Sequence, residues 1–182
     1  TAKRKDSVVT SPVSLFRRED AMSRDDARRA LGLDLNRPTA LVQLGTGDSD
    51  VNEKVTAALS GLLGWKELQV ILTKAPVDKD GNSLAPEGLD LKVVRYFPLA
   101  KVLHAFDAGI CATGYNGVHE LLPAQVPTAF VSNIRGTDDQ EARAKWCNDF
   151  GFALRADQAD LADITEKVKM LQDPAVRKRL SD

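Results

Sequence analysis

Three short polar segments carry the residues best suited to chemistry, and each follows an apolar run. They are LGTGDSDVN (44–52), ATGYNGVHE (112–120) and SNIRGTDDQEA (132–142). Glycines directly after a strand let backbone amides approach an anion, and a carboxylate beside them can accept two neighbouring hydroxyls. Together the segments could therefore bind a ligand that contains phosphate and a sugar diol.

The first segment has glycines at Gly45 and Gly47, on either side of Thr46. It is not a complete dinucleotide fingerprint, because Asp50 occupies the place of the third glycine, and it is not a P-loop, because no Gly-Lys-Ser/Thr follows. Asp48 and Asp50 are spaced like a weak metal pair, yet no further ligand joins them, so we predict no metal site. A tight turn that needs glycine for its backbone angles explains this segment equally well.

The second segment ends a predicted strand at Thr113-Gly114 and leads into a helix through Asn116-Gly117. We expect the helix to occupy 118–124, with the amides of 115–118 directed at an anion. Glu120 would then lie in the first turn, where its carboxylate suits a ribose diol. Taken alone, Glu120 fits an ordinary acid at the positive end of a helix better.

The third segment follows a predicted strand, and we expect Asp138 to cap the next helix and Asp139 and Gln140 to project near the sheet edge. A simple capped helix would also explain it. For the two histidines, His104 and His119, we expect structural roles rather than catalytic ones.

These segments must be positioned by an alternation of strands and helices that recurs about six times. The predicted strands are 39–44, 68–74, 91–97, 108–113, 128–133 and 151–155. Two predicted helices begin at Ser23 and near Pro174, and the others occupy 52–63, 99–106, 118–124, 138–149 and 160–171. Because the strands are apolar on both faces, they predict a parallel sheet covered by helices on each side. The fold class is therefore α/β, a doubly wound, Rossmann-like sheet of about six strands, in which ligands bind beyond the carboxyl ends of the strands.

The composition excludes several other classes. A chain of 182 residues with a net charge of −1 is about one domain long and has no field that favours nucleic acid. No apolar run is long enough for a transmembrane segment. Cys111 and Cys147 lack zinc or redox spacing, which together with the absence of a secretory signal predicts a cytoplasmic location.

The order of these motifs resembles the donor-binding half of the GT-B glycosyltransferases, over roughly residues 38–172. The family motif runs His-x-Gly-x-Asn-Ser-x-x-Glu, then Gly-x-Pro, then Asp-Gln followed by Asn-Ala. The corresponding residues here are Ala112, Gly114, Asn116, Gly117 and Glu120, then Val126-Pro127, then Asp139-Gln140 with Glu141-Ala142. The glycine segment is also similar to that of the peptidoglycan N-acetylglucosaminyltransferases.

The resemblance implies a role for each matching residue. Glu120 would bind the ribose hydroxyls, and the loop at Phe97 would bind the base. Asp139 and Gln140 would hydrogen-bond the donor sugar. Two loops would face the diphosphate, one formed by Thr113, Gly114, Asn116 and Gly117 and the other by Gly45, Thr46 and Gly47. The nucleotide would be UDP or dTDP, with no further cofactor.

The resemblance also implies two domains with separate roles. Residues 1–35 would be a linker and leading helix, and residues 36–182 the donor-binding domain. An N-terminal domain, in the same or a partner chain, would supply the acceptor site and the catalytic base, and the isolated domain would be inactive. Ala112 stands where many family members have a histidine. The retaining branch has acids around this loop, and Ala112 is not one, so the resemblance favours an inverting reaction by direct displacement.

Three other functions stay open. A sugar-nucleotide epimerase shares this fold and a ribose carboxylate, although Ala112 argues against it. A non-catalytic nucleotide-binding module would fit an isolated half. A nicotinamide-dependent oxidoreductase would need an acid at the end of the second strand, where Lys74 stands instead.

Overall fold

The computed structural model describes residue 8 and residues 10–45, 51–73, 86–134 and 138–182. Its strands form one parallel sheet in the order β3-β2-β1-β4-β5-β6. The strands are β1 (Thr39–Gln43), β2 (Gln69–Thr73), β3 (Asp90–Val94), β4 (Ala108–Ala112), β5 (Thr128–Val131) and β6 (Leu154–Ala156). This topology confirms the predicted doubly wound fold.

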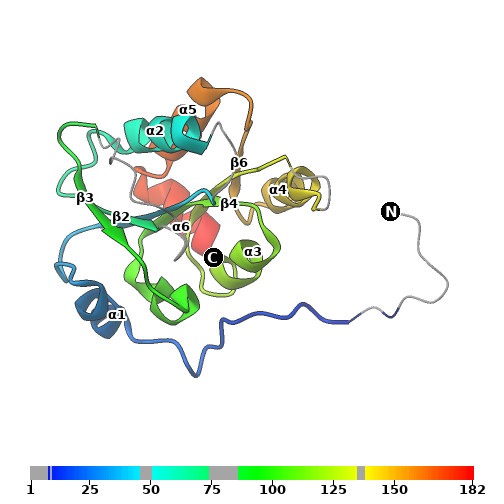
Figure 1. Ribbon diagram of the computed structural model, residues 1–182, viewed down its shortest axis with the longest axis horizontal. Helices are drawn as coiled ribbons and strands as arrows, with labels where there is room; N and C mark the ends of the chain where they lie inside the picture. Colours follow the sequence, from blue (N-terminus) through cyan, green and yellow to red (C-terminus); the bar gives the residue numbers. More distant parts are fainter. Residues whose placement is uncertain (1–7, 9, 46–50, 74–85, 135–137) are drawn as a thin grey trace.

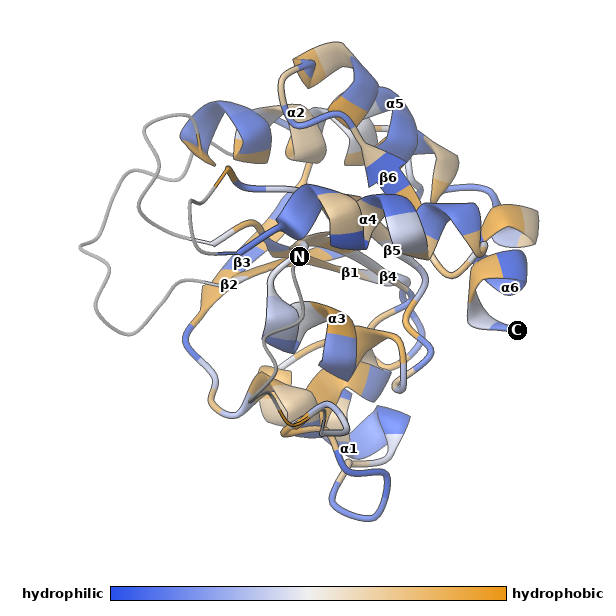
Figure 2. Cartoon of the chain, turned by 90° about the vertical axis from the view of Figure 1, so that its right-hand side faces the viewer, coloured by the Kyte–Doolittle hydropathy of each residue, from blue (hydrophilic) through white to orange (hydrophobic). Residues whose placement is uncertain are grey.

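Helices cover both faces of the sheet (Figures 1 and 2). They are α1 (Arg24–Leu31), α2 (Val51–Leu62), the 3-10 helix η1 (Leu99–Ala105), α3 (Tyr115–Leu121), α4 (Gln140–Asp149), α5 (Leu161–Met170) and α6 (Pro174–Ser181). On one face α2 and α5 pack together through residues such as Leu59 and Ile164. On the other face Leu31, Leu103 and Leu121 join α1, η1 and α3 to the sheet. Each face thus buries its own apolar cluster, as a doubly wound sheet requires.

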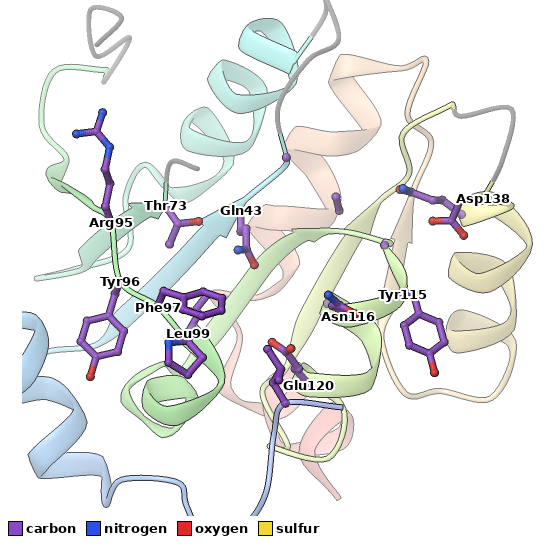
Figure 3. A pocket seen from close by; sticks show the side chains of 17 residues that line it. Gln43, Thr73, Arg95, Tyr96, Phe97, Leu99, Tyr115, Asn116, Glu120 and Asp138 are labelled. Atoms are coloured by element: carbon purple, nitrogen blue, oxygen red, sulfur yellow. The ribbon is translucent and has the colours of Figure 1, made fainter. Parts of the chain in front are cut away.

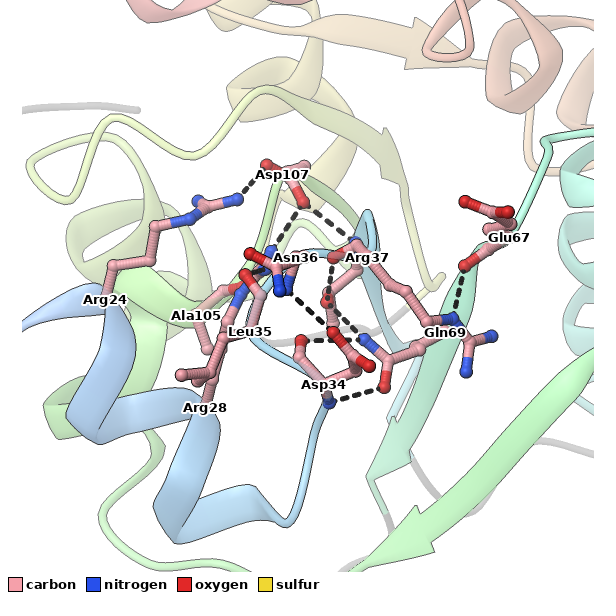
Figure 4. A network of polar contacts seen from close by, with 11 residues as sticks. Arg24, Arg28, Asp34, Leu35, Asn36, Arg37, Glu67, Gln69, Ala105 and Asp107 are labelled. Atoms are coloured by element: carbon pink, nitrogen blue, oxygen red, sulfur yellow. Dashed lines mark hydrogen bonds and ion pairs between the residues drawn. The ribbon is translucent and has the colours of Figure 1, made fainter.

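A polar network fixes α1 to the amino-terminal edge of the sheet (Figure 4). The Arg28 side chain is 1% exposed and forms an ion pair with Asp107 at 2.8 Å. The Arg28 Nε also donates to the carbonyl oxygen of Ala105 at 3.0 Å. The Asp107 carboxylate in turn accepts from the Thr39 amide at 2.8 Å, at the start of β1. The leading helix is therefore tied to the edge of the sheet that lies away from the strands' carboxyl ends.

Several boundaries differ from the sequence prediction. The helix expected at 118–124 begins at Tyr115 and ends at Leu121, so Glu120 lies in its second turn and not in the first. The sixth strand begins at Leu154 and not at residue 151, because Gly151 adopts a left-handed φ of 77° that ends α4. Strand β3 is largely exposed and forms one edge of the sheet.

Candidate functional site

A cavity of about 700 Å³ opens at the carboxyl ends of the central strands. Strands β1 and β4 are neighbours there, and their connections lead to helices on opposite faces, α2 after β1 and α3 after β4. This is the point where the strand order reverses, which is the usual ligand site of such sheets. The volume lies within the range of small-molecule sites.

Most of the contact residues predicted from the sequence line the cavity. Its wall includes Gly45, Phe97, Gly114, Asn116, Gly117, Glu120 and Gln140. Thr46 and Gly47, like Asp48 and Asp50, lie outside the described residues. In Figure 3, Asn116 and Glu120 of α3 lie on one side, Phe97 and Leu99 lie nearby, and Gln43 and Thr73 mark the ends of β1 and β2. Segments far apart in the sequence are therefore brought to one site.

The start of α3 presents its first amides without a side-chain cap. Gly114 is the N-cap residue and has no side chain to cap the helix, whereas the side chains of Ser23, Asp139, Asp160 and Asp173 cap other helices. Only from Val118 onward does an amide find a helical acceptor, the carbonyl oxygen of Gly114 at 3.2 Å. The amides of residues 115–117, which lie beside the cavity, therefore have no helical or capping partner. A Cβ at Gly117 would lie 3.1 Å from the Ala112 carbonyl oxygen, so glycine lets this turn lie close to the end of β4.

Glu120 provides a partly buried carboxyl group on the cavity wall. Burial raises the pKa of its side chain above the ordinary value. A partly desolvated carboxylate lowers its free energy when it accepts hydrogen bonds from a ligand. Its second-turn position places it beyond the uncapped amides along α3, so the two features can contact different parts of one ligand.

Gln140 lies beside the turn at Gly114 and is joined to the turn after β1 by a buried chain of hydrogen bonds. Its Oε1 accepts from the Asn133 amide at 3.0 Å, and the Asn133 side chain donates to the carbonyl oxygen of Leu44 at 3.0 Å. The Gln140 Nε2 lies 4.0 Å from the Cβ position of Gly114. Gln140 thus supports the site as well as lining it. Asn133 was missed from the sequence, where only its place at the end of a strand could have indicated it.

Two of the predicted contact residues do not line the cavity. Thr113 is fully buried, and its carbonyl oxygen accepts from Arg143. Asp139 caps α4 by accepting from the Ala142 amide at 3.0 Å, so the prediction that Asp138 forms this cap was wrong. Asp138 lines the cavity instead and pairs with Arg143 at 2.7 Å. The acid adjacent to the expected one therefore faces the site.

The cavity also has walls that no sequence motif indicated. Leu15 lines it from the leading segment, and Gln43, Thr73 and Arg95 line it at the ends of β1, β2 and β3. A polar residue closing an apolar strand was the available signal for Gln43 and Thr73. Leu15 had none, because it lies in a segment without periodicity.

The described part of the chain offers neither a metal-binding cluster nor a membrane-spanning helix. Among its residues, no group of three or more His, Cys, Asp or Glu side chains is arranged to hold a metal ion. None of its helices has the length and apolar character needed to cross a bilayer. The cytoplasmic location stays a prediction.

No protein-family model matches the chain. A curated relative from Paenarthrobacter aurescens is a UDP-N-acetylglucosamine–N-acetylmuramyl-(pentapeptide) pyrophosphoryl-undecaprenol N-acetylglucosamine transferase. It is 31% identical over an alignment of 170 residues, and the match covers 89% of this chain and 44% of the relative. The chain thus spans less than half the length of this relative.

Solved structures agree with this relationship. The glycosyltransferase of kitacinnamycin matches with a TM-score of 0.62 and 25% identity, over 80% of this chain and 37% of the other. Acinetobacter baumannii MurG matches with a TM-score of 0.62 and 24% identity, over 88% of this chain and 46% of the other. By sequence and by fold, the chain is a homologue of one domain of the GT-B glycosyltransferases.

Proposed function

We propose that the chain is the donor-binding part of an inverting glycosyltransferase that uses a UDP-sugar. The observation that carries this proposal is that Glu120, the uncapped amides of residues 115–117 and Gly45 lie on the wall of one cavity. The printed name of the Paenarthrobacter relative supports UDP-N-acetylglucosamine as the donor class. A dTDP-sugar is the alternative donor.

The arrangement of the cavity suggests how a donor would lie. The Glu120 carboxylate accepts hydrogen bonds from both hydroxyls of the ribose, since one carboxylate can accept from two donors. The diphosphate lies against the amides of residues 115–117 and the turn at Gly45. The base lies against Phe97, which is 82% exposed at the rim of the cavity. The sugar extends toward Gln140 and Asp138 at the start of α4.

The proposed reaction is transfer of the sugar to an acceptor hydroxyl by direct displacement. Negative charge grows on the diphosphate as the sugar bond breaks, and fixed amides stabilise that charge best in the transition state. A second domain, in the same or a partner chain, supplies the acceptor site and the base that takes the hydroxyl proton. Ala112, where the chain offers no carboxylate, supports inversion over retention.

The proposal is tested with nucleotide binding, which does not require the second domain. Calorimetric titration with UDP, dTDP and NAD should give the tightest binding for UDP. Glu120→Gln keeps the shape of the side chain but removes its charge. Because hydrogen bonds to a charged group contribute about 1.5–3 kcal/mol, we expect UDP affinity to fall about ten- to 150-fold.

A matched control is Glu166→Gln, an exposed acid on α5 outside the cavity wall, which should bind UDP like the parent. Tightest binding to NAD would refute the transferase assignment. Tighter binding to dTDP than to UDP would change the donor class. Equal UDP affinity in Glu120→Gln and the parent would refute the ribose assignment.

A further inference from the structure

The leading segment crosses two of the elements that form the cavity. Residues 13–16 run in an irregular, extended path beside α3, below Glu120 in Figure 3. Hydrogen bonds and ring contacts attach this segment to α3 and η1, both of which line the cavity. We call residues 13–16 the strap.

Tyr115 and the backbone of His119 hold the first half of the strap. The Val13 amide donates to the Tyr115 hydroxyl oxygen at 2.8 Å, and the Ser14 hydroxyl donates to the His119 carbonyl oxygen at 2.7 Å. The Tyr115 ring lies against the His119 ring with centroids 4.4 Å apart, which fixes the direction of its hydroxyl. One face of α3 therefore provides two attachment points for the strap.

The second half of the strap is fixed on η1. The Phe16 amide donates to the Ser14 hydroxyl oxygen at 3.0 Å, and the Phe16 ring is buried edge-on against His104 with centroids 5.8 Å apart. His104 is itself held by the Met22 carbonyl oxygen at 3.2 Å. With both neighbours attached to the domain, Leu15 has little freedom to leave the cavity wall.

Leu15 is the strap residue that faces the cavity. Its side chain lines the cavity and is nevertheless 55% exposed. Leu15 and Glu120 line the same cavity, and burial of the Glu120 carboxyl group there raises its pKa. The strap therefore supplies an apolar part of the wall of the cavity that also contains the group that we assign to the ribose.

We propose that the strap completes the nucleotide site, with Leu15 as its wall and Tyr115 as the positioning residue that holds it in place. This inference rests on the proposed function, because it assumes that a nucleotide occupies the cavity. A site that is competent only when the strap is attached loses apparent affinity in proportion to the detached fraction. Segments that precede the domain in sequence would thereby influence how tightly it binds its donor.

The test uses the whole chain with UDP as the probe. Tyr115→Phe keeps the ring contact with His119 and removes only the hydroxyl that Val13 uses. Since one hydrogen bond contributes about 0.5–1.5 kcal/mol, we expect UDP affinity to fall about two- to twelvefold. Ser14→Ala should weaken binding similarly, and Ser14→Thr, which restores a hydroxyl, should recover it. Leu15→Ala should weaken binding, whereas Leu15→Met should retain it.

Hydrogen exchange provides a readout that does not depend on UDP. The amides of Val13 and Phe16 should be protected in the parent and should exchange faster in Tyr115→Phe and Ser14→Ala. Ser60→Ala is the matched control, because the Ser60 hydroxyl also donates to a backbone carbonyl, that of Thr56 at 2.9 Å, on a helix remote from the strap. It should change neither exchange nor affinity.

The outcomes separate this inference from the proposed function. If Glu120→Gln weakens UDP binding while Tyr115→Phe and Leu15→Ala bind like the parent, the strap has no role in the site and the proposed function stands. Unprotected amides at Val13 and Phe16 in the parent would also overturn the inference. If the parent binds no UDP, both the inference and the proposed function fail.

Discussion

The ion pair between Arg28 and Asp107 gives the sharpest prediction about stability. The Arg28 guanidinium is buried and donates to the carbonyl oxygens of Ala105 and Leu35 as well as to Asp107 (Figure 4). Asp107→Ala removes the only carboxylate that Arg28 pairs with among the described residues. It also leaves the Thr39 amide without its acceptor at the start of β1.

The expected magnitude follows from this burial. Breaking a buried ion pair by removing one partner costs about 3–5 kcal/mol, because an uncompensated charge stays inside. The Asp107 side chain is 22% exposed, so water can replace part of the lost interaction, and we expect the lower end, about 3 kcal/mol. For a domain of this size the thermal midpoint falls by about 2–4 °C per kcal/mol, which gives about 6–12 °C.

Urea denaturation and calorimetry of Asp107→Ala and the parent provide the measurement. Asp107→Asn retains the shape and one oxygen acceptor, so it should lose less. The matched control is Asp149→Ala, which breaks an exposed i,i+4 pair with Lys145 and should cost about 0.5 kcal/mol or less. A loss in Asp107→Ala no larger than that in Asp149→Ala would refute the argument that this network fixes α1.

Three further predictions concern packing, pH and thiols. Gly61→Ala should cost about 1–3 kcal/mol in urea denaturation, because its Cβ would lie 2.6 Å from the Thr165 carbonyl oxygen and would push α2 away from α5. The raised pKa of Glu120 means that the folded state favours its protonated form, so this contribution to stability is lost as pH rises from 4.5 through the raised pKa. Glu120→Gln should therefore give a flatter profile of unfolding free energy against pH, and a profile as steep as the parent's would contradict this. Burial raises the pKa of the Cys111 and Cys147 thiols, so a colorimetric thiol reagent should label neither until denaturant is added.

The sequence was informative about the sheet because apolar strands and glycine turns are local signals. It was less so where a residue's burial depends on its neighbours in space. We predicted a strand apolar on both faces at 91–97, whereas β3 contains Asp90 and Lys92 and lies at one edge of the sheet, where most of its residues are exposed. The start of α3 was placed three residues late, because Gly117 indicates a turn in sequence, whereas in the fold it allows close contact with Ala112.

The candidate site was predictable to the extent that its residues follow strands directly. Gly45, Gly114 and Glu120 met at one cavity because carboxyl ends of parallel strands share an edge. The strap could not be predicted in this way. Val13 and Tyr115 are 102 positions apart, and a single hydrogen bond between them leaves no periodic pattern in either segment.

The amino-terminal and carboxyl ends of the strands differ in how their polar groups are satisfied. This difference supports assigning function to the cavity. At the amino-terminal edge, Asp107 accepts from Arg28 and from the first amide of β1, so the charged groups there stabilise the fold. At the carboxyl edge, the first amides of α3 have no cap and Glu120 is desolvated without an ion-pair partner among the described residues. Leaving such groups without partners costs free energy that a fold could recover with a capping side chain or a neutral residue. Glu120→Gln should therefore stabilise the free domain at neutral pH while weakening UDP binding, a combination expected of a binding residue and not of a structural one.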